Sequence, residues 1–422
     1  MSSLPGETYR LAYPNLPNLE NPPYVSYGRR HHEACAHHVE NTFQAQRVYL
    51  IASTSLSKNT SEVSKLQTAL GSRLAGTRIG ISPHTPWDEV IAATKEAVAV
   101  KADCIVTLGG GSIIDGAKCM LLFIANDITS VEQIAPFGAK IRATQGAMRQ
   151  SSAGLDCVAP TIPLICIPTT LSGGEYTQYA GGTDPETHYK LVMGHPFCGP
   201  RLIICDPLVT LTTPRWVWLS TGVRGVDHAV ECYCRVHEPE ESVDAAALEA
   251  LRLIVAGLLG TSKEWEDEEA RLRNLLGVGV ALYMLRKGVL GTGASHGIGH
   301  QLGPLGVGHG ETSCILLPSV SKWNAKVNGE KQERIKAVLW SEETVATVLK
   351  ARGLKEDTAD LGDCLDAVFR ELGMPRTLQE VGVGRDKFAA LAANSLKDFC
   401  CEVNPIPMVR EEQVLEILEM CA

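Results

Sequence analysis

The sequence predicts an α/β domain with a parallel sheet, followed by a domain made only of helices. Up to about residue 207, short apolar runs rich in β-branched residues alternate with helix-like stretches. Beyond that point, apolar residues recur at helical spacing through long segments. A chain of 422 residues, of which 45% are hydrophobic and 21% charged, is long enough for two or three globular domains.

The composition argues against several classes of partner and environment. A net charge of −9 disfavours a nucleic-acid-binding surface, which needs clustered positive charge. No run of 18 apolar residues occurs, so a membrane span is not expected, and the polar start of the chain lacks the apolar core of a secretory signal. The 14 cysteines show no paired zinc-binding spacing, and several lie in apolar runs, which favours a reducing, cytoplasmic environment.

Residues 1–46 are expected to form an irregular N-terminal arm. The arm contains two histidine pairs, His31-His32 and His37-His38. Metal binding is one interpretation of such pairs, but nothing in their spacing defines a ligand geometry. A solvated or packing role is therefore favoured.

The α/β domain is expected over residues 47–207. Its predicted strands are 48–53, 78–82, 104–108, 164–168 and 201–206. One helix is predicted up to Leu74, and another over 112–125. A third is predicted to run to about Val100, with Thr85 as its N-cap, Pro86 as its first residue and Asp88 in its first turn.

The helical domain is expected over residues 208–422. Its clearest predicted helices are 244–259, 268–288, 360–372, 385–399 and 410–421. Many of them have apolar faces beyond what one core needs, which favours a homodimer.

A glycine-rich turn joins the third predicted strand to the following helix. Gly109, Gly110, Gly111 and Ser112 stand between the apolar run CIVTL and the helix. Glycines let the backbone approach a ligand closely, and a helix N-terminus offers unpaired N–H donors. The pyrophosphate of a dinucleotide is the expected ligand, although an ordinary tight turn is the alternative.

A second polar loop follows the fourth predicted strand. The segment 168–182 carries the hydroxyl groups of Thr169, Thr170, Ser172 and Thr177 among small residues. Such a loop at the carboxyl end of a strand suits a ribose and its phosphate. The two loops together favour a dinucleotide site more strongly than either one alone.

Three histidines fall within one glycine-rich segment of the second domain. His296 and His300 are four residues apart and would share one face of a helix, while His309 lies in a glycine-rich loop that could return to that face. With His228 they could bind a divalent metal, or they could supply a proton to a reduced carbonyl group.

These segments together resemble the iron-containing alcohol dehydrogenase superfamily. The resemblance covers about residues 45–410 and is carried by four blocks in order: GGGSIIDGAK (109–118), PTTLSGGEYT (168–177), DHAVECY (227–233) and HGIGHQLGPLGVGHGE (296–311). It implies a dehydroquinate synthase-like fold, with a Rossmann-like dinucleotide-binding domain, a helical domain and the site in the cleft. HGETSCILLP (309–318) and NPIPM (404–408) are most similar to the maleylacetate reductase branch, with Ile406 replacing that branch's arginine.

The resemblance implies NAD or NADP as cofactor. Many NAD-using relatives carry an acidic residue after the first strand, where this chain has Ser53, so either dinucleotide is allowed. Asp115 and Lys190 are also assigned to the cofactor site.

The chain departs from the superfamily at the metal. Metal-dependent members place an aspartate four residues before their first histidine ligand, which matches His228, and here that position holds Arg224. A guanidinium cannot ligate a cation, and Asp227 points some 100° away from His228 around the helix. A metal-free site is therefore expected, with ligation by His228, His296 and His309 as the alternative.

The expected activity is reduction of a carbonyl or conjugated oxo-acid by NADH or NADPH, and the resemblance to the maleylacetate reductase branch implies a small dicarboxylic oxo-acid as substrate. Arg224 would grip a substrate carboxylate or polarise a carbonyl oxygen, although a salt bridge to Glu231 is its alternative role. His296 or His300 would donate the proton. A metal-dependent alcohol dehydrogenase and a non-redox biosynthetic enzyme on the same fold are the competing interpretations.

Overall fold

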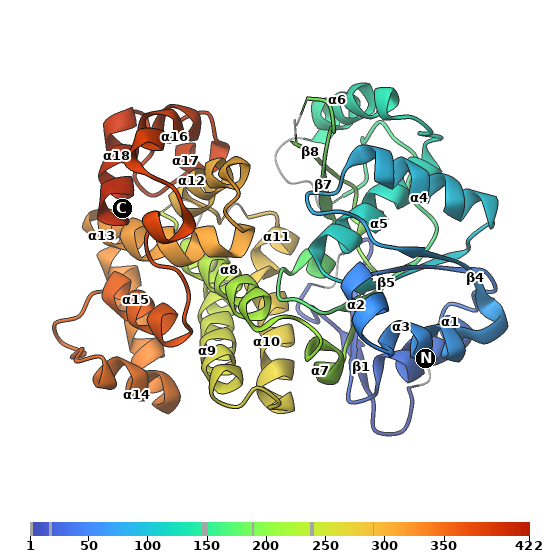
Figure 1. Ribbon diagram of the computed structural model, residues 1–422, viewed down its shortest axis with the longest axis horizontal. Helices are drawn as coiled ribbons and strands as arrows, with labels where there is room; N and C mark the ends of the chain where they lie inside the picture. Colours follow the sequence, from blue (N-terminus) through green and yellow to red (C-terminus); the bar gives the residue numbers. More distant parts are fainter. Residues whose placement is uncertain (1–2, 17–18, 146–150, 188–189, 237–239, 290) are drawn as a thin grey trace. The chain divides into compact units, whose positions relative to one another are not determined.

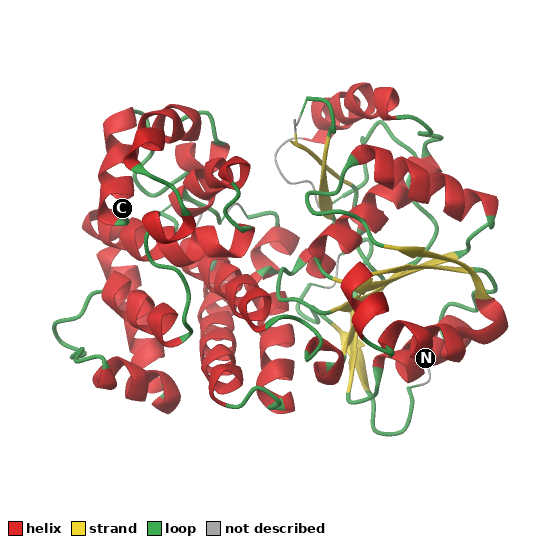
Figure 2. Ribbon diagram, in the orientation of Figure 1, coloured by secondary structure: helices red, strands yellow, loops and turns green. Residues whose placement is uncertain are grey.

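The computed structural model describes residues 3–422 apart from 17–18, 146–150, 188–189, 237–239 and 290. It divides into two compact units (Figure 1). Unit 1 comprises Met1–Thr212 and Arg286–Gly288, and unit 2 comprises Thr213–Leu285 and Val289–Ala422. All strands of the described residues belong to unit 1, and unit 2 is helical (Figure 2).

The main sheet of unit 1 has the strand order β1-β2-β9-β6-β5-β3-β4 among the described residues. β1 runs antiparallel to β2, and the other neighbouring strands are parallel. The strands are β1 (Thr8–Leu11), β2 (Tyr24–Tyr27), β3 (Val48–Ala52), β4 (Leu74–Ile79), β5 (Cys104–Gly109), β6 (Leu164–Pro168) and β9 (Leu202–Cys205). A separate antiparallel pair is formed by β7 (Tyr179–Thr183) and β8 (Lys190–Gly194).

Helices cover both faces of this sheet, as parallel strands buried on two sides require. Tyr49 and Ile51 of β3 pack on the face that also buries Trp87, whereas Val48 and Leu50 pack on the face that buries Val39. The helices of unit 1 are α1 (His31–Asn41), α2 (Thr54–Asn59), α3 (Glu62–Leu70), α4 (Trp87–Ala99), α5 (Gly111–Ala125), α6 (Ile134–Gln145) and α7 (Pro207–Thr210).

The N-terminal residues are more regular than the sequence suggested. β1, β2 and α1 lie within 1–46. β2 pairs with β9, and β1 forms the edge of the sheet opposite to β4. His31 and His38 are fully buried. His31 Nδ1 lies 2.9 Å from Asp206 Oδ2 and so ties the segment to the rest of unit 1, whereas His38 Nε2 lies 2.8 Å from Glu7 Oε1 and holds the segment together internally.

Three predicted boundaries in unit 1 were wrong. The helix predicted up to Leu74 ends at Leu70, and Leu74 is the first residue of β4. The second core strand, β4, ends at Ile79 rather than spanning 78–82. Helix α4 begins at Trp87 with Pro86 as N-cap, because Thr85 adopts a positive φ of 55° that a helix N-cap does not use.

Unit 2 is a bundle in which α8 and α13 each pack on several other helices. The remaining helices of the chain are α8 (Arg215–Cys234), α9 (Glu241–Lys263), α10 (Glu268–Ala281), α11 (Tyr283–Lys287), α12 (Ala294–Leu302), α13 (His309–Ser341), α14 (Glu343–Ala351), α15 (Leu361–Glu371), α16 (Phe388–Ser395), α17 (Phe399–Glu402) and α18 (Glu411–Met420). Ile298 of α12, Leu316 of α13 and Leu391 of α16 share one apolar cluster, which fixes α12 within the bundle.

Three predictions for unit 2 also needed correction. The helix predicted over 385–399 is shorter, α16 (Phe388–Ser395), and Phe399 begins a separate helix, α17. The segment 268–288 is not one helix but two, α10 and α11, which Leu282 separates. His309 is not in a loop but is the first residue of α13. No helix in the described part of the chain is long and apolar enough to cross a membrane.

Candidate active site

The glycine turn, residues 109–112, lies where β5 ends and α5 begins. A Cβ atom added to Gly110 would stand 3.1 Å from Thr170 Cγ2, and one added to Gly111 would stand 3.0 Å from Ser172 Oγ. The turn therefore has room for backbone only. The first turn of α5 supplies the N–H donors that no intrahelical carbonyl accepts.

The threonine loop, residues 168–182, contacts this turn directly. Thr169 N donates to Gly109 O at 3.2 Å, and the hydroxyl oxygens of Thr170 and Ser172 lie 3.1 Å apart. Ser53, which follows β3, donates its backbone N–H to Leu108 O at 2.9 Å. The structure thus brings together, at the carboxyl ends of β3, β5 and β6, residues from three of the predicted cofactor segments.

Other predicted cofactor residues hold the loop itself. The buried ammonium of Lys118 lies 2.8 Å from Asp115 Oδ1 and donates to Gly174 O at 2.8 Å. Thr177 donates its hydroxyl to Gly174 O at 3.4 Å. Lys190 is exposed and begins β8. Lys118 is not among the predicted site residues, although its position three residues after Asp115 on a predicted helix indicates that the two side chains can meet.

The threonine loop itself contains a buried acid, Glu175. Glu175 is only 1% exposed, and its Oε2 has no hydrogen-bond partner among the described residues. Burial raises its pKa to about 7, and the nearby carboxylate of Asp115 adds to the increase. Lys118 opposes this shift but does not cancel it. The pKa of Glu175 in the folded protein therefore lies close to neutral pH.

In unit 2, the predicted catalytic residues come from the three helices α8, α12 and α13. Arg224 of α8 is 4% exposed, and its Nη1 donates to Ser313 Oγ of α13 at 2.9 Å. The same Nη1 lies 3.6 Å from Asp227 Oδ2, one turn along α8. The carboxylate within ion-pair distance of Arg224 is therefore Asp227, not Glu231 as the sequence analysis considered.

Asp227 is the centre of a buried polar group that the sequence did not reveal. Its Oδ2 accepts from Ser313 Oγ at 2.5 Å and from Ser295 Oγ at 2.9 Å. Its other oxygen, Oδ1, has no hydrogen-bond partner among the described residues. The two serines stand on other helices, so no spacing along the chain could have linked them to Asp227.

A chain of three side chains runs from Glu231 to His228. Glu231 Oε2 lies 2.6 Å from His296 Nδ1, and His296 Nε2 lies 3.1 Å from His228 Nδ1. Both ring nitrogens of His296 are thus engaged inside the protein. His228 contacts His296 through Nδ1, so Nε2 is the ring nitrogen of His228 that can contact a substrate.

His300 and His309 differ from these two in being exposed. Their rings stack with centroids 6.1 Å apart and an interplanar angle of 6°. His300 Nδ1 lies 2.9 Å from Asp398 Oδ2, and this contact lowers the pKa of Asp398 against the effect of its burial. The predicted pairing of His296 and His300 on one helix is correct, with ring centroids 6.4 Å apart.

Burial shifts every titratable group in the core of this site toward its neutral form. It raises the pKa values of Asp227 and Glu231, and the proximity of the two acids to each other raises that of Asp227 further. It lowers the pKa values of His228 and His296, and the positive charge of Arg224 lowers them further. His228 and His296 are therefore neutral imidazoles at neutral pH.

The donor set does not fit the superfamily's metal site. Arg224 holds the position of the aspartate ligand and presents no lone pair. In the described part of the chain, the groups whose ligand atoms gather within 4.8 Å do not include the trio of His228, His296 and His309. Asp227, Glu231 and His296 form such a group, but its Asp227 already lies beside the guanidinium.

Comparison with known families matches both halves of the chain. A model described as "Iron-containing alcohol dehydrogenase" matches residues 22–207. A second, described as "Fe-containing alcohol dehydrogenase family, C-terminal", matches residues 218–422. Together they cover both units.

Individual proteins show the same similarity along nearly the whole chain. Dehydrogenase ALT3 of Alternaria alternata is 40% identical over 89% of this chain and 99% of its own length. Dehydrogenase FUM7 of Gibberella moniliformis is 38% identical over 95% of this chain and 96% of its own. The structure of maleylacetate reductase from Agrobacterium tumefaciens superposes with a TM-score of 0.73 at 22% identity, covering 94% of this chain and 95% of that one.

Proposed function

Because this chain belongs to the iron-containing alcohol dehydrogenase family and is an oxidoreductase, we propose that it uses NADH or NADPH to reduce a carbonyl or conjugated oxo-acid without a metal ion. The observation that carries the proposal is Arg224. A buried guanidinium stands where metal-dependent relatives need a carboxylate, and it is bonded to Ser313 rather than left free to move aside. A positive side chain therefore replaces a metal cation as the electrophilic group.

In the proposed site, the glycine turn binds the pyrophosphate. Gly110 and Gly111 let the backbone approach the phosphates, and the first turn of α5 directs N–H groups at them. Thr170 and Ser172 line the same turn with hydroxyl groups suited to a ribose or phosphate. The reduced nicotinamide supplies the hydride.

The substrate carbonyl is proposed to be polarised by Arg224 and by Nε2 of His228. This nitrogen carries the proton of the neutral His228 ring when a protonated Glu231 donates to His296 Nδ1 and His296 Nε2 donates to His228 Nδ1. The chain from Glu231 through His296 orients the His228 ring, and desolvation strengthens the attraction between the guanidinium and a developing oxyanion. A carboxylate on the substrate would also suit the guanidinium, because the two match bidentately. This favours a small oxo-acid over a plain aldehyde.

His300 is proposed as the proton donor. His296 has both ring nitrogens engaged inside the protein, whereas His300 is exposed and has only Nδ1 bonded to Asp398. A carboxylate that holds one nitrogen of an imidazole fixes the ring with its other nitrogen turned outward. His300 is thus the better placed of the two histidines that the sequence suggested.

A metal-dependent activity is the second candidate, because Asp227, Glu231 and His296 gather their ligand atoms within 4.8 Å. Two facts oppose it. Arg224 Nη1 lies 3.6 Å from Asp227, and Glu231 already accepts two backbone N–H groups at 2.6 and 2.8 Å. A cation would have to displace those contacts.

The decisive experiment measures oxidation of NADH and NADPH with a panel of small oxo-acids, together with the metal content of the purified protein. We expect turnover that survives prolonged chelation and a metal content far below one equivalent. Turnover that is lost on chelation and restored by Fe²⁺ or Zn²⁺ would refute the metal-free proposal. No nicotinamide oxidation with any carbonyl compound would refute the redox proposal.

A further inference from the structure

Three successive N–H groups at the start of α12 are bound by side chains from elsewhere in unit 2. Gly293 N and Ser295 N donate to the two carboxylate oxygens of Glu231 at 2.6 and 2.8 Å. Ala294 N donates to Asn404 Oδ1 at 3.0 Å. A helix leaves these donors without intrahelical partners, so the two side chains satisfy them and fix the helix start.

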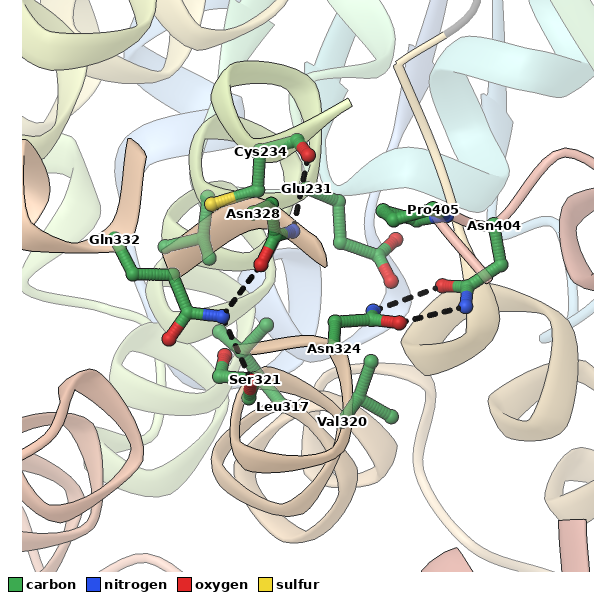
Figure 3. Close-up of a pocket in the computed structure, with 11 residues that line it drawn as sticks. Glu231, Cys234, Leu317, Val320, Ser321, Asn324, Asn328, Gln332, Asn404 and Pro405 are labelled. Atoms are coloured by element: carbon green, nitrogen blue, oxygen red, sulfur yellow. Dashed lines mark hydrogen bonds between the residues drawn. The ribbon is translucent and has the colours of Figure 1, made fainter. Parts of the chain in front are cut away.

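Asn404 uses its whole hydrogen-bonding capacity in this position. It is fully buried, and its Nδ2 donates to Asn324 Oδ1 at 2.9 Å and to Ile406 O at 2.8 Å. Its Oδ1 accepts from Asn324 Nδ2 at 3.1 Å as well as from Ala294. Figure 3 shows the two amides facing each other, with Asn324 on α13 and Asn404 on the C-terminal segment that follows α17. With two donors and two acceptor sites filled, the amide has one orientation.

A second amide pair in the same region makes no such contact. It lies on the other side of a small cavity of about 20 Å³ (Figure 3). Asn328 Nδ2 donates to Cys234 O at 3.0 Å, and Gln332 Nε2 donates to Asn328 Oδ1 at 2.8 Å. Asn328 is about as buried as Asn324, at 5% against 4%, and lies four residues further along α13, at a kink where its own backbone is not helical (φ −131°, ψ 20°). None of these bonds reaches α12.

Asn404 packs so closely against the start of α12 that no further atom fits between them. A Cβ added to Gly293 would stand 2.9 Å from Asn404 Oδ1 and 3.0 Å from Glu231 Oε1. His296 follows three residues later, in the first turn of the helix that these contacts hold. Its ring reaches Glu231 at 2.6 Å and His228 at 3.1 Å, so a shift of the first turn would stretch both contacts.

We propose that Asn404 is a positioning residue for His296. It holds the first turn of α12 through Ala294, while Asn324 holds Asn404, and so it sets the distance from the His296 ring to His228. The inference rests on the proposed function for its kinetic consequence, because His228 acts there on the substrate. The structural consequence does not depend on that function.

The test compares Asn404→Leu with Asn328→Leu, which removes a buried amide from the lining of the same cavity without removing any contact to α12. Hydrogen exchange of the amides in 293–296 should accelerate at least tenfold in Asn404→Leu and stay at the wild-type rate in Asn328→Leu. The kcat of nicotinamide oxidation should fall roughly ten- to a hundredfold in Asn404→Leu only, as small displacements of catalytic groups produce. The KM for the dinucleotide should stay within about twofold of wild type.

A double variant separates positioning from simple stability. Asn324→Leu with Asn404→Leu replaces both facing amides by apolar groups, which should recover much of the Tm lost in Asn404→Leu. It cannot restore the acceptor for Ala294 N, so kcat should stay low and exchange in 293–296 fast.

Two results would overturn the proposal. One is unchanged exchange at 293–296 in Asn404→Leu, and the other is a kcat that recovers together with Tm in the double variant. If the wild-type protein oxidises no nicotinamide, the proposed function fails alone. The exchange comparison between Asn404→Leu and Asn328→Leu then still decides whether Asn404 holds α12.

Discussion

Nη1 of Arg224 lies 3.6 Å from Oδ2 of Asp227, one turn apart on α8 and both buried. Each group depends on the other for its charge. Burial lowers the pKa of Arg224 and raises that of Asp227, and the attraction between the two opposes both shifts. A substitution of one partner therefore leaves the other to bear the full cost of burial, either as an unpaired charge or by a change of its protonation state.

Replacing Arg224 by methionine should lower both stability and activity. Loss of the guanidinium should lower the free energy of unfolding by about 3–5 kcal/mol, the usual cost of breaking a buried pair. The double variant Arg224→Met with Asp227→Asn should recover most of this loss in denaturant titrations. Both variants should lose roughly a hundredfold or more in kcat/KM, since neither polarises the carbonyl. A double variant with wild-type kcat/KM would remove Arg224 from the mechanism.

Replacing His300 by glutamine should lower kcat by about a hundredfold or more, the usual contribution of a general acid. The KM for NADH or NADPH should change little. Asp398→Asn should have a smaller effect, because the imidazole stays and loses only its orienting carboxylate. His84→Asn changes an exposed histidine of unit 1 and serves as the control in steady-state assays. Equal kcat values for the His300 and His84 variants would exclude His300 as the donor.

Replacing Gly111 by alanine should weaken binding of the dinucleotide. The added Cβ would stand 3.0 Å from Ser172 Oγ and would occupy space that the phosphates need. We expect the Kd for NADH or NADPH to rise about tenfold, or about 1.4 kcal/mol, in fluorescence titrations. Gly329→Ala is the control, because a Cβ there meets nothing within 4 Å. Unchanged affinity in the Gly111 variant would argue against a phosphate at this turn.

Glu175 should make the protein less stable as pH rises. Its pKa is raised from 4.5 to about 7 in the folded state, so the folded protein binds more protons than the unfolded chain between these values. The contribution of Glu175 to stability is thus present below pH 4.5, falls as pH rises to 7, and is constant above. Glu175→Gln should gain on wild type by a few kcal/mol across this window, at about 1.4 kcal/mol per pKa unit.

Denaturant titrations of both proteins at several pH values check this prediction. The matched control is Glu264→Gln, which removes the exposed C-cap residue of α9 rather than a buried acid of the threonine loop. A difference between Glu175→Gln and wild type that does not change from pH 4.5 to 7 would show that Glu175 is not held near neutrality.

The sequence by itself determined the alternation of buried strands and helices in unit 1. Runs such as LICIP are apolar at every position, and only a strand covered on both faces buries such a run. It also determined that the glycine turn and the threonine loop meet, since the loops that follow parallel strands share one edge of the sheet. His296 and His300 share a helix face for the same local reason, their spacing of four.

Only the tertiary structure decided which groups act together in unit 2. Asp227 is bonded to Ser295 and Ser313, which stand 68 and 86 residues away in the chain. Asn404 meets Ala294 across 110 residues. Helical periodicity shows which face of a helix is apolar, but not which helix lies against it. The partners of Arg224, and with them the chemistry of this site, therefore depend on packing that no local pattern records.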